Sequence, residues 1–315
     1  MMENLRKKGG AKVLREEMVG ERLKWVAIDS DNLSQTSDLY ATYGIDEELI
    51  SYALDRNERA HMEYDWQTET MLIIYNVLNR TKEDNHYETI PITFIVRGEQ
   101  LITIFNEDNA YIVDLMRHYL QRRPDVSVYK FLFMGLFLVS ETYFPYLEEL
   151  DKSSSQLNRR LRQRTTKKDL LGLSDIETGM VYLVSATNQN AILLEQLKGQ
   201  PFYKQLDNIE KEQLEDSLIE ARQLSSMTQV HAQVLQQLSG TYNNILNNNL
   251  NDNMTTLTIV SIILAVFAVI TGFFGMNVPL PWSSNQNAWL IIILICIILW
   301  LVITAFIRYM IHRKS

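Results

Sequence analysis

The charged residues of this chain are confined to its first 252 positions and its last eight. Residues 253–307 contain no Asp, Glu, Lys, Arg or His, whereas residues 1–252 hold all 38 acidic residues and 27 of the 30 basic ones. One helical span needs roughly 20 apolar residues, so this uncharged stretch can cross a bilayer twice. The division predicts an acidic soluble domain joined to a membrane-embedded part. A formal charge of −11 over residues 1–252 argues against a nucleic-acid partner and favours cations.

Two candidate spans lie within the uncharged stretch. Residues 288–307 are 20 residues broken by one threonine, and the basic tail 308–315 follows them. Residues 253–275 are a weaker candidate, richer in Thr, Ser, Ala and Gly. Basic flanks favour the cytoplasmic side. The tail therefore predicts a multi-pass protein of the plasma membrane, with both ends and the acidic domain in the cytoplasm and residues 276–287 as a short external loop.

The first span and the residues before it differ from an ordinary anchor in the distribution of their small and polar residues. In steps of three and four, one helix face comprises Asn247, Asn251, Met254, Thr258, Ser261, Ala265, Ala268 and Gly272. Such a stripe either packs helices closely or lines a pore in which side-chain oxygens face passing ions. Two spans cannot enclose a pore. The second interpretation therefore requires an oligomer with the first span as inner ring and the more hydrophobic second span as outer ring.

The segment before the first span has helical periodicity and contains no proline between Pro201 and Pro279. It predicts one helix over residues 205–274, roughly 100 Å long at about 1.5 Å per residue, with Gly240 as a candidate bend. The asparagine-rich residues 243–253 are either a polar linker or, within the helix, rings of amide oxygens at the cytoplasmic mouth of a pore.

The soluble part is predicted to contain an α/β domain over residues 1–125 and helices over residues 126–252. Segments rich in β-branched residues predict strands at 23–29, 70–79, 88–98 and 100–106, with a tight turn at 97–100. Helical patterns occupy 43–55, 108–120, about 126–165 and 174–198. Ser174 and Glu177 form a capping-box pattern at the start of the last of these. The expected fold class is therefore an α/β cytoplasmic domain followed by long stalk helices and two transmembrane helices.

Four segments carry a resemblance to a known family: WVAIDSDN (25–32), YGIDEELISYAL (43–54), RGEQLITIFNEDN (97–109) and, above all, FFGMN (273–277). Gly-Met-Asn alone is a weak signal, but here it stands at the end of the penultimate span of a two-span chain. In this setting essentially the whole chain resembles the CorA family of divalent-cation transport channels. The resemblance implies a homopentameric, funnel-shaped channel that moves Mg²⁺, and often Co²⁺ or Ni²⁺, down the electrochemical gradient.

The resemblance also implies roles for residues of the pore. Gly275, Met276 and Asn277 would form the external selectivity ring, where amide and carbonyl oxygens grip a hydrated Mg²⁺ ion. Met254 and Leu257 match positions at which the family narrows its pore with apolar side chains. The external loop departs from many relatives because it holds no carboxylate.

A regulatory Mg²⁺ site between neighbouring cytoplasmic domains is a further implication of the resemblance. Asp216 matches one acidic position of that site, with Glu215 and Glu220 nearby. A solvated helix carboxylate is the alternative role for Asp216. Ser51 and Tyr52 stand where many relatives carry an acidic pair, which is a departure at the other side of the expected site.

Three other functions fit the sequence less well. A ZntB-type transporter, which imports Zn²⁺ with protons, shares the architecture, but Met276 favours the magnesium branch. The five histidines lack close ligand spacing, and the single cysteine, Cys296, excludes an intrachain disulfide and a cysteine-based zinc site. A two-span receptor or scaffold would leave the polar stripe unexplained, and no catalytic motif indicates an enzyme. The expected partners are divalent cations, further copies of the chain and membrane lipid, with Mg²⁺ as substrate and regulatory ligand and without a cofactor.

Overall fold

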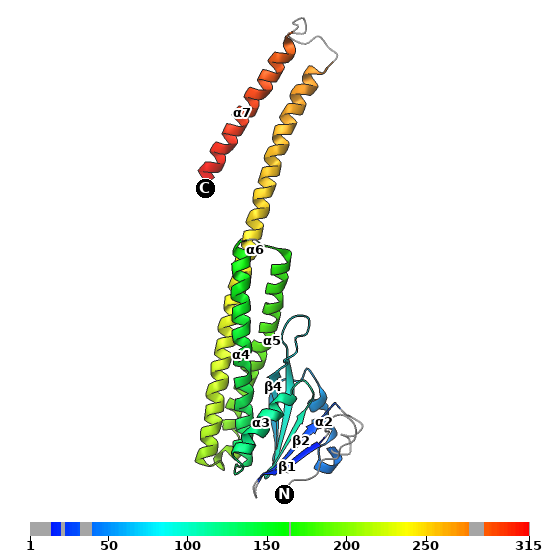
Figure 1. The fold of residues 1–315 in the computed structure, drawn as a ribbon, viewed down its shortest axis with the longest axis vertical. Coiled ribbons are helices and arrows are strands. Elements are labelled where there is room, and N and C mark those ends of the chain that lie inside the picture. The colour runs from blue at the N-terminus through cyan, green and yellow to red at the C-terminus, as the bar shows by residue number, and fades with distance from the viewer. Residues whose placement is uncertain (1–13, 20–22, 32–39, 164, 277–286, 315) are drawn as a thin grey trace. The chain divides into compact units, whose positions relative to one another are not determined.

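The computed structural model describes residues 14–19, 23–31, 40–163, 165–276 and 287–314 of the chain. The chain divides into two compact units, an N-terminal unit over Met1–Ser239 and a C-terminal unit over Gly240–Ser315. The N-terminal unit contains a β-sheet and its covering helices (Figure 1). The C-terminal unit contains the last part of the long helix α6 (Asn208–Phe274) and helix α7 (Ala288–Lys314).

Six strands form the sheet of the N-terminal unit, in the order β1-β2-β6-β5-β4-β3. Their bounds are β1 Leu14–Val19, β2 Leu23–Asp29, β3 His61–Asp65, β4 Thr70–Leu78, β5 Thr89–Arg97 and β6 Gln100–Phe105. Strands β2 and β6 pair in parallel, and the other neighbours pair antiparallel. The four predicted strands are confirmed, and so is the turn between β5 and β6, where Gly98 has φ +57°.

Strands β1 and β3 were not predicted, and both lie at the edges of the sheet. The sequence of β3, HMEYD, carries two acidic residues within five positions, and its side chains are half-buried or exposed. Edge strands tolerate charge because one side of the ladder faces solvent, and the charge protects the edge from pairing with other chains. The apolar pattern that reveals a central strand is therefore weak in such a strand.

Helices cover both faces of the sheet, which explains why β4 is buried at every position. On one face, α2 (Glu47–Leu54) packs over a cluster that includes Val26, Ile74 and Ile95. Helices α3 (Ala110–Arg122), α4 (Val128–Gln163) and α5 (Lys167–Lys198) also contact the sheet. These observations confirm the predicted α/β class of the soluble domain.

The predicted start of α5 at Ser174 was wrong. The helix begins at Lys167, and its cap is Thr166, whose Oγ1 accepts a hydrogen bond from the Asp169 amide at 3.2 Å. Ser174 lies within the helix, where its carbonyl oxygen accepts the Thr178 hydroxyl at 2.9 Å. Thr166 supplies an earlier and complete N-cap, so the helix is already formed before the second capping pattern is reached.

An amide side chain of α5 continues the sheet beyond the end of β3. The pairing of β3 with β4 ends at His61 and Ile74, so the Asn76 backbone has no strand partner on that side. Asn190 replaces the strand: its Oδ1 accepts from the Asn76 amide at 3.0 Å, and its Nδ2 donates to the Asn76 carbonyl at 2.7 Å. Both residues are buried, and the side chain thereby satisfies backbone groups that water cannot reach.

The predicted long helix is confirmed as α6. Its start is fixed by a reciprocal pair, in which the Asp207 amide donates to Glu210 Oε2 at 2.9 Å and the Glu210 amide donates to Asp207 Oδ1 at 2.7 Å. Within the N-terminal unit its buried face includes Leu214, Leu218 and Leu224. The helix thus combines a stretch fixed in a soluble core with a stretch of purely apolar and small residues.

Candidate functional site

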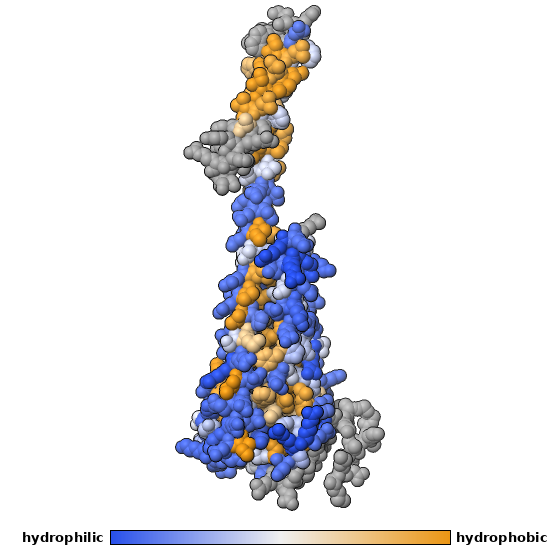
Figure 2. All heavy atoms as spheres, turned by 60° about the vertical axis from the view of Figure 1, so that its left-hand side comes forward, coloured by the Kyte–Doolittle hydropathy of each residue, from blue (hydrophilic) through white to orange (hydrophobic). Residues whose placement is uncertain are grey.

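The polar stripe predicted on the long helix lies wholly within α6 and is open to solvent in the single chain. All of its members are exposed: Asn247, Asn251, Met254, Thr258, Ser261, Ala265, Ala268 and Gly272. The hydrophobic surface of the C-terminal part of α6 contrasts with the hydrophilic surface of the N-terminal unit (Figure 2). Such a stripe on an otherwise apolar helix lacks a partner within the described residues, and so its pore-lining role stays a prediction.

Hydroxyl groups on the stripe are oriented by the helix backbone. Thr258 Oγ1 donates to the Met254 carbonyl, and Ser261 Oγ donates to the Leu257 carbonyl, each at 2.8 Å. A hydroxyl that donates its hydrogen to the helix backbone can act only as an acceptor toward other groups. The same bond satisfies a polar group in an apolar environment, as Thr271 does with the Phe267 carbonyl at 2.9 Å. The stripe therefore offers oxygen acceptors, which are suited to cations.

Two apolar residues interrupt or border the stripe near its N-terminal end. Met254 is 59% exposed and Leu257 is 68% exposed in the single chain. Large apolar side chains that are this exposed are normally buried against another apolar surface. Lipid or further copies of the helix can supply such a surface. Their predicted role as a hydrophobic constriction requires several copies and stays a prediction.

The C-terminal end of α6 leaves little room for a side chain at position 275. The Gly275 amide donates to the Thr271 carbonyl at 2.9 Å, and a Cβ at position 275 would lie only 3.0 Å from that same oxygen. Met276 follows with its side chain half exposed. Residues 277–286, which include Asn277, lie outside the described residues, so the selectivity ring stays a prediction.

Among the described residues, α6 is the one helix long and apolar enough to cross a membrane. The described part of α7 contributes a shorter apolar stretch, Trp289–Ile303. The side chains of the tail residues Arg308, Tyr309 and Arg313 lie outside the described part. The two-span arrangement and the cytoplasmic tail therefore stay predictions.

The three acidic residues expected at a regulatory site lie on α6 in the N-terminal unit. Asp216 is exposed. Glu215 accepts a hydrogen bond from Lys198 Nζ at 2.6 Å, which raises the pKa of that lysine. Burial, followed by the nearby carboxylate of Glu141, raises the pKa of Glu220. One chain brings together no group of three His, Cys, Asp or Glu side chains that could hold a metal, as far as its described residues show.

The expected second side of that site lies on α2. Ser51 is exposed there, and the Tyr52 hydroxyl donates to Glu48 Oε1 at 3.3 Å. Negative charge from Glu48 and Glu63, in that order, raises the pKa of Tyr52. The surroundings of Tyr52 are thus acidic, because Glu48, Glu63 and Glu58 all lie near its hydroxyl. The regulatory site between copies of the chain stays a prediction.

Comparison with known proteins agrees with this architecture. A family model described as CorA-like Mg²⁺ transporter protein matches residues 20–309. The cobalt/magnesium transport protein CorA of Methanocaldococcus jannaschii is 24% identical over 295 residues, which cover 91% of this chain and 90% of that protein. The complete structure of the CorA magnesium transporter from the same organism matches with a TM-score of 0.76 at 21% identity, covering 91% of this chain and 90% of that one.

A more distant likeness exists to the cytoplasmic domain of ZntB from Vibrio parahaemolyticus. Its TM-score is 0.52 at 9% identity, and the match covers 77% of this chain and all of that one. At this identity the likeness shows a shared fold of the soluble part and carries no information on the transported ion.

Proposed function

The chain belongs to the family of CorA-like Mg²⁺ transporters, and from this premise we propose that it forms a channel for divalent metal cations, above all Mg²⁺ and also Co²⁺ and Ni²⁺. The proposed direction is influx down the electrochemical gradient across the plasma membrane. Both ends of the chain and the acidic domain face the cytoplasm in this proposal, because a basic tail favours that side. No catalytic step is involved.

The observation that carries the proposal is the exposed stripe of oxygen-bearing and small residues on the apolar part of α6. One such helix cannot surround an ion. In the proposed homopentamer five copies of α6 would face each other, with Thr258 and Ser261 offering hydroxyl oxygens to the path. Met254 and Leu257 would then form a constriction that closes by losing its water.

Selectivity is proposed to lie at Gly275, Met276 and Asn277. Mg²⁺ holds its water shell tightly and is bound through few protein oxygens. A ring of neutral amide and carbonyl oxygens can hold such a hydrated ion without trapping it. The hydrogen bond from the Gly275 amide to the Thr271 carbonyl, at 2.9 Å, supports a helical turn that continues up to this ring.

Regulation is proposed to use Mg²⁺ bound between neighbouring cytoplasmic domains, with Asp216 as the main ligand and Glu215 and Glu220 close by. We expect Asp216→Ala to shift inhibition by internal Mg²⁺ to at least several-fold higher concentrations while the maximal flux stays near that of the wild type. Glu212→Ala is the matched control, because Glu212 is another exposed carboxylate one turn away on α6. Unchanged inhibition in Asp216→Ala would leave this residue a solvated helix carboxylate.

The function is tested with purified protein in liposomes that contain a Mg²⁺ dye and a pH dye. Mg²⁺, Co²⁺, Ni²⁺ and Zn²⁺ are added outside in turn under an imposed membrane potential. We expect potential-driven Mg²⁺ influx without a proton signal. Influx of Zn²⁺ accompanied by protons, with no Mg²⁺ signal, would instead assign the chain to a proton-coupled zinc transporter.

A further inference from the structure

The connection between α4 and α5 holds a dense cluster of basic residues. Residues 152–174 contain seven basic side chains and one acidic side chain, whereas the rest of residues 1–252 contains 20 basic and 37 acidic ones. Five exposed basic residues flank the turn between the two helices, and we call them the basic tip: Arg159, Arg160, Arg162, Lys167 and Lys168. One end of an otherwise acidic unit is therefore positively charged.

Little of this positive charge is neutralised by the protein itself. The single acidic residue of the stretch, Asp169, pairs with Arg160 at 2.9 Å. Arg159, Arg162 and Lys167 form no ion pair with any residue that the structure describes. Lys167 also lies in the first turn of α5, where the helix dipole is already positive. An anion outside the chain would therefore stabilise this arrangement.

An exposed leucine accompanies the charges of the basic tip. Leu171 is 56% exposed and lies one helical turn after Lys167 and Lys168 on α5. Exposed apolar side chains beside lysines are typical of helices that touch a membrane surface. In such helices the apolar side chain enters the interface, and the ammonium groups meet the phosphates of the lipid headgroups.

The basic tip lies at the end of the N-terminal unit where α6 leaves it (Figure 1). Helix α4 runs in the same direction as α6. Near its start the Phe133 carbonyl accepts the Ser217 hydroxyl at 2.8 Å. Further along, an Asp151 carboxylate oxygen lies 3.8 Å from His231 Nδ1. The hairpin of α4 and α5 therefore extends along α6 toward the apolar part of the chain.

The distance from this end of the unit to the apolar segment is short. Twelve residues of α4 follow Asp151, and eight residues of α6 follow His231 up to Ser239, so the basic tip reaches the end of the unit. The uncharged stretch begins at residue 253, fourteen residues after Ser239, which is about 21 Å of helix. A headgroup layer of about 6 Å and a Debye length of about 8 Å cover most of this distance. The long arginine and lysine side chains can reach across the remainder.

We propose that the basic tip binds the headgroups of anionic phospholipids in the cytoplasmic leaflet. Clusters of several Lys and Arg residues beside a membrane span bind such lipids through the negative surface potential of the leaflet. The rest of the unit is acidic and is repelled by the same surface, so the tip is the part that makes contact. This inference rests on the proposed membrane position of the apolar part of α6, but not on the identity of the transported ion.

The contact is tested with full-length protein in nanodiscs that contain phosphatidylcholine and a minor fraction of phosphatidylglycerol. Cys296→Ser removes the single native cysteine, and Gln163→Cys at the turn carries a fluorophore. Either of the two lipids carries a spin label near its headgroup, at equal amounts. We expect labelled phosphatidylglycerol to quench the fluorophore about three-fold or more strongly than labelled phosphatidylcholine, and high salt to remove the difference.

A fluorophore on Gln205→Cys is the control for position, because Gln205 is exposed beyond the far end of α5. It is expected to be quenched by neither lipid. Equal quenching of the Gln163→Cys fluorophore by both lipids, or by neither, would overturn this inference while normal Mg²⁺ influx kept the proposed channel. Lipid-selective quenching in a protein that conducts no divalent cation would support the lipid contact and contradict the proposed channel.

Charge removal gives an independent test. The combined change Arg159→Gln, Arg162→Gln and Lys167→Gln is expected to abolish the preference for phosphatidylglycerol. The matched control, Arg59→Gln with Arg122→Gln and Lys204→Gln, removes three exposed charges elsewhere on the unit and is expected to keep the preference. Equal melting temperatures of the two variants would show that neither is misfolded.

A different anionic partner would give a different pattern. Binding of an RNA oligonucleotide to protein in phosphatidylcholine nanodiscs, lost in the tip variant, with no preference between the lipids, would assign the basic tip to nucleic acid and overturn the inference. An unchanged lipid preference in the tip variant would also overturn it.

Discussion

Position 275, at the end of α6, is the first position of the proposed selectivity ring and leaves little room for a side chain. The Cβ of any other residue would lie 3.0 Å from the Thr271 carbonyl oxygen, which also accepts the amide of position 275. A glycine fits this last turn of α6 without any shift, whereas a larger residue would need a small displacement of the backbone.

The proposed selectivity ring depends most directly on Asn277. We expect Asn277→Ala to reduce Mg²⁺ influx into liposomes below about one tenth of the wild-type rate, because the ring loses its side-chain oxygens. Asn285→Ala is the control, since it removes a side-chain amide from the same predicted external loop, residues 276–287. The mass of the assembly is measured for both variants. Undiminished influx in Asn277→Ala would remove this residue from the selectivity ring.

At the scale of elements, buried side-chain hydrogen bonds connect α5 both to the sheet and to α6. Asn190 of α5 bonds the backbone of β4, and the Thr187 and Thr228 hydroxyls join α5 to α6 at 2.9 Å. These groups are buried, so each would be left without water if its partner were lost. Buried hydrogen bonds of this kind fix one relative placement of the elements, whereas purely apolar contacts allow several.

The Asn190 joint gives a stability prediction. In Asn190→Ala the Asn76 amide loses its acceptor, whereas the Asn76 carbonyl keeps the Tyr143 hydroxyl at 2.9 Å. One buried donor without a partner costs about 2 kcal/mol. We expect the melting temperature of the full-length protein to fall by roughly 4–8 °C. Thr178→Ala, an exposed change on the same helix, is expected to shift it by less than about 1 °C; equal shifts in both variants would contradict the assigned role of Asn190.

Elements with strong apolar patterns could be predicted from the sequence. Elements whose position depends on contacts with other parts of the fold could not. The strand β2 was predicted at Leu23–Asp29, and the long helix within three residues of its start at Asn208. The edge strand β3 was missed because its alternating, charged sequence gives a weak pattern. The start of α5 was misplaced because two capping patterns occur in succession, and only tertiary structure shows that Thr166 is the one in use.

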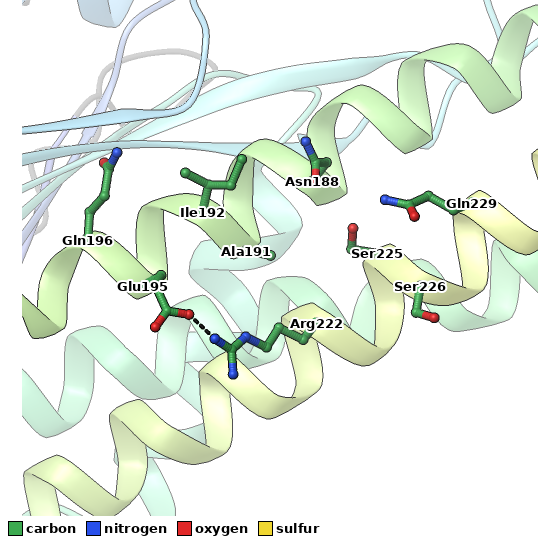
Figure 3. Close-up of a pocket in the computed structure, with 9 residues that line it drawn as sticks. All are labelled: Asn188, Ala191, Ile192, Glu195, Gln196, Arg222, Ser225, Ser226 and Gln229. Atoms are coloured by element: carbon green, nitrogen blue, oxygen red, sulfur yellow. Dashed lines mark hydrogen bonds and ion pairs between the residues drawn. The ribbon is translucent and has the colours of Figure 1, made fainter.

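At the scale of the whole molecule, the two parts of the chain differ in their content of charged residues. The acidic residues belong almost entirely to the N-terminal unit, and residues 253–307 of the C-terminal unit carry no charged side chain. The stripe on α6 could be predicted from spacing alone, because it lies on one helix. The groove between α5 and α6 (Figure 3) could not, because it depends on how these two helices pack against each other.

In the proposed channel, ions pass along the exposed stripe of α6. The most direct measurement uses Cys296→Ser protein in liposomes, with either Ala265→Cys on the stripe or Ile270→Cys, which lies about 140° further around the helix. A small cationic thiol reagent is added while Mg²⁺ influx is recorded. We predict that the reagent blocks influx through the Ala265→Cys channel and leaves the Ile270→Cys channel active. Block of Ile270→Cys with Ala265→Cys unaffected would contradict the assignment of the stripe to the ion path.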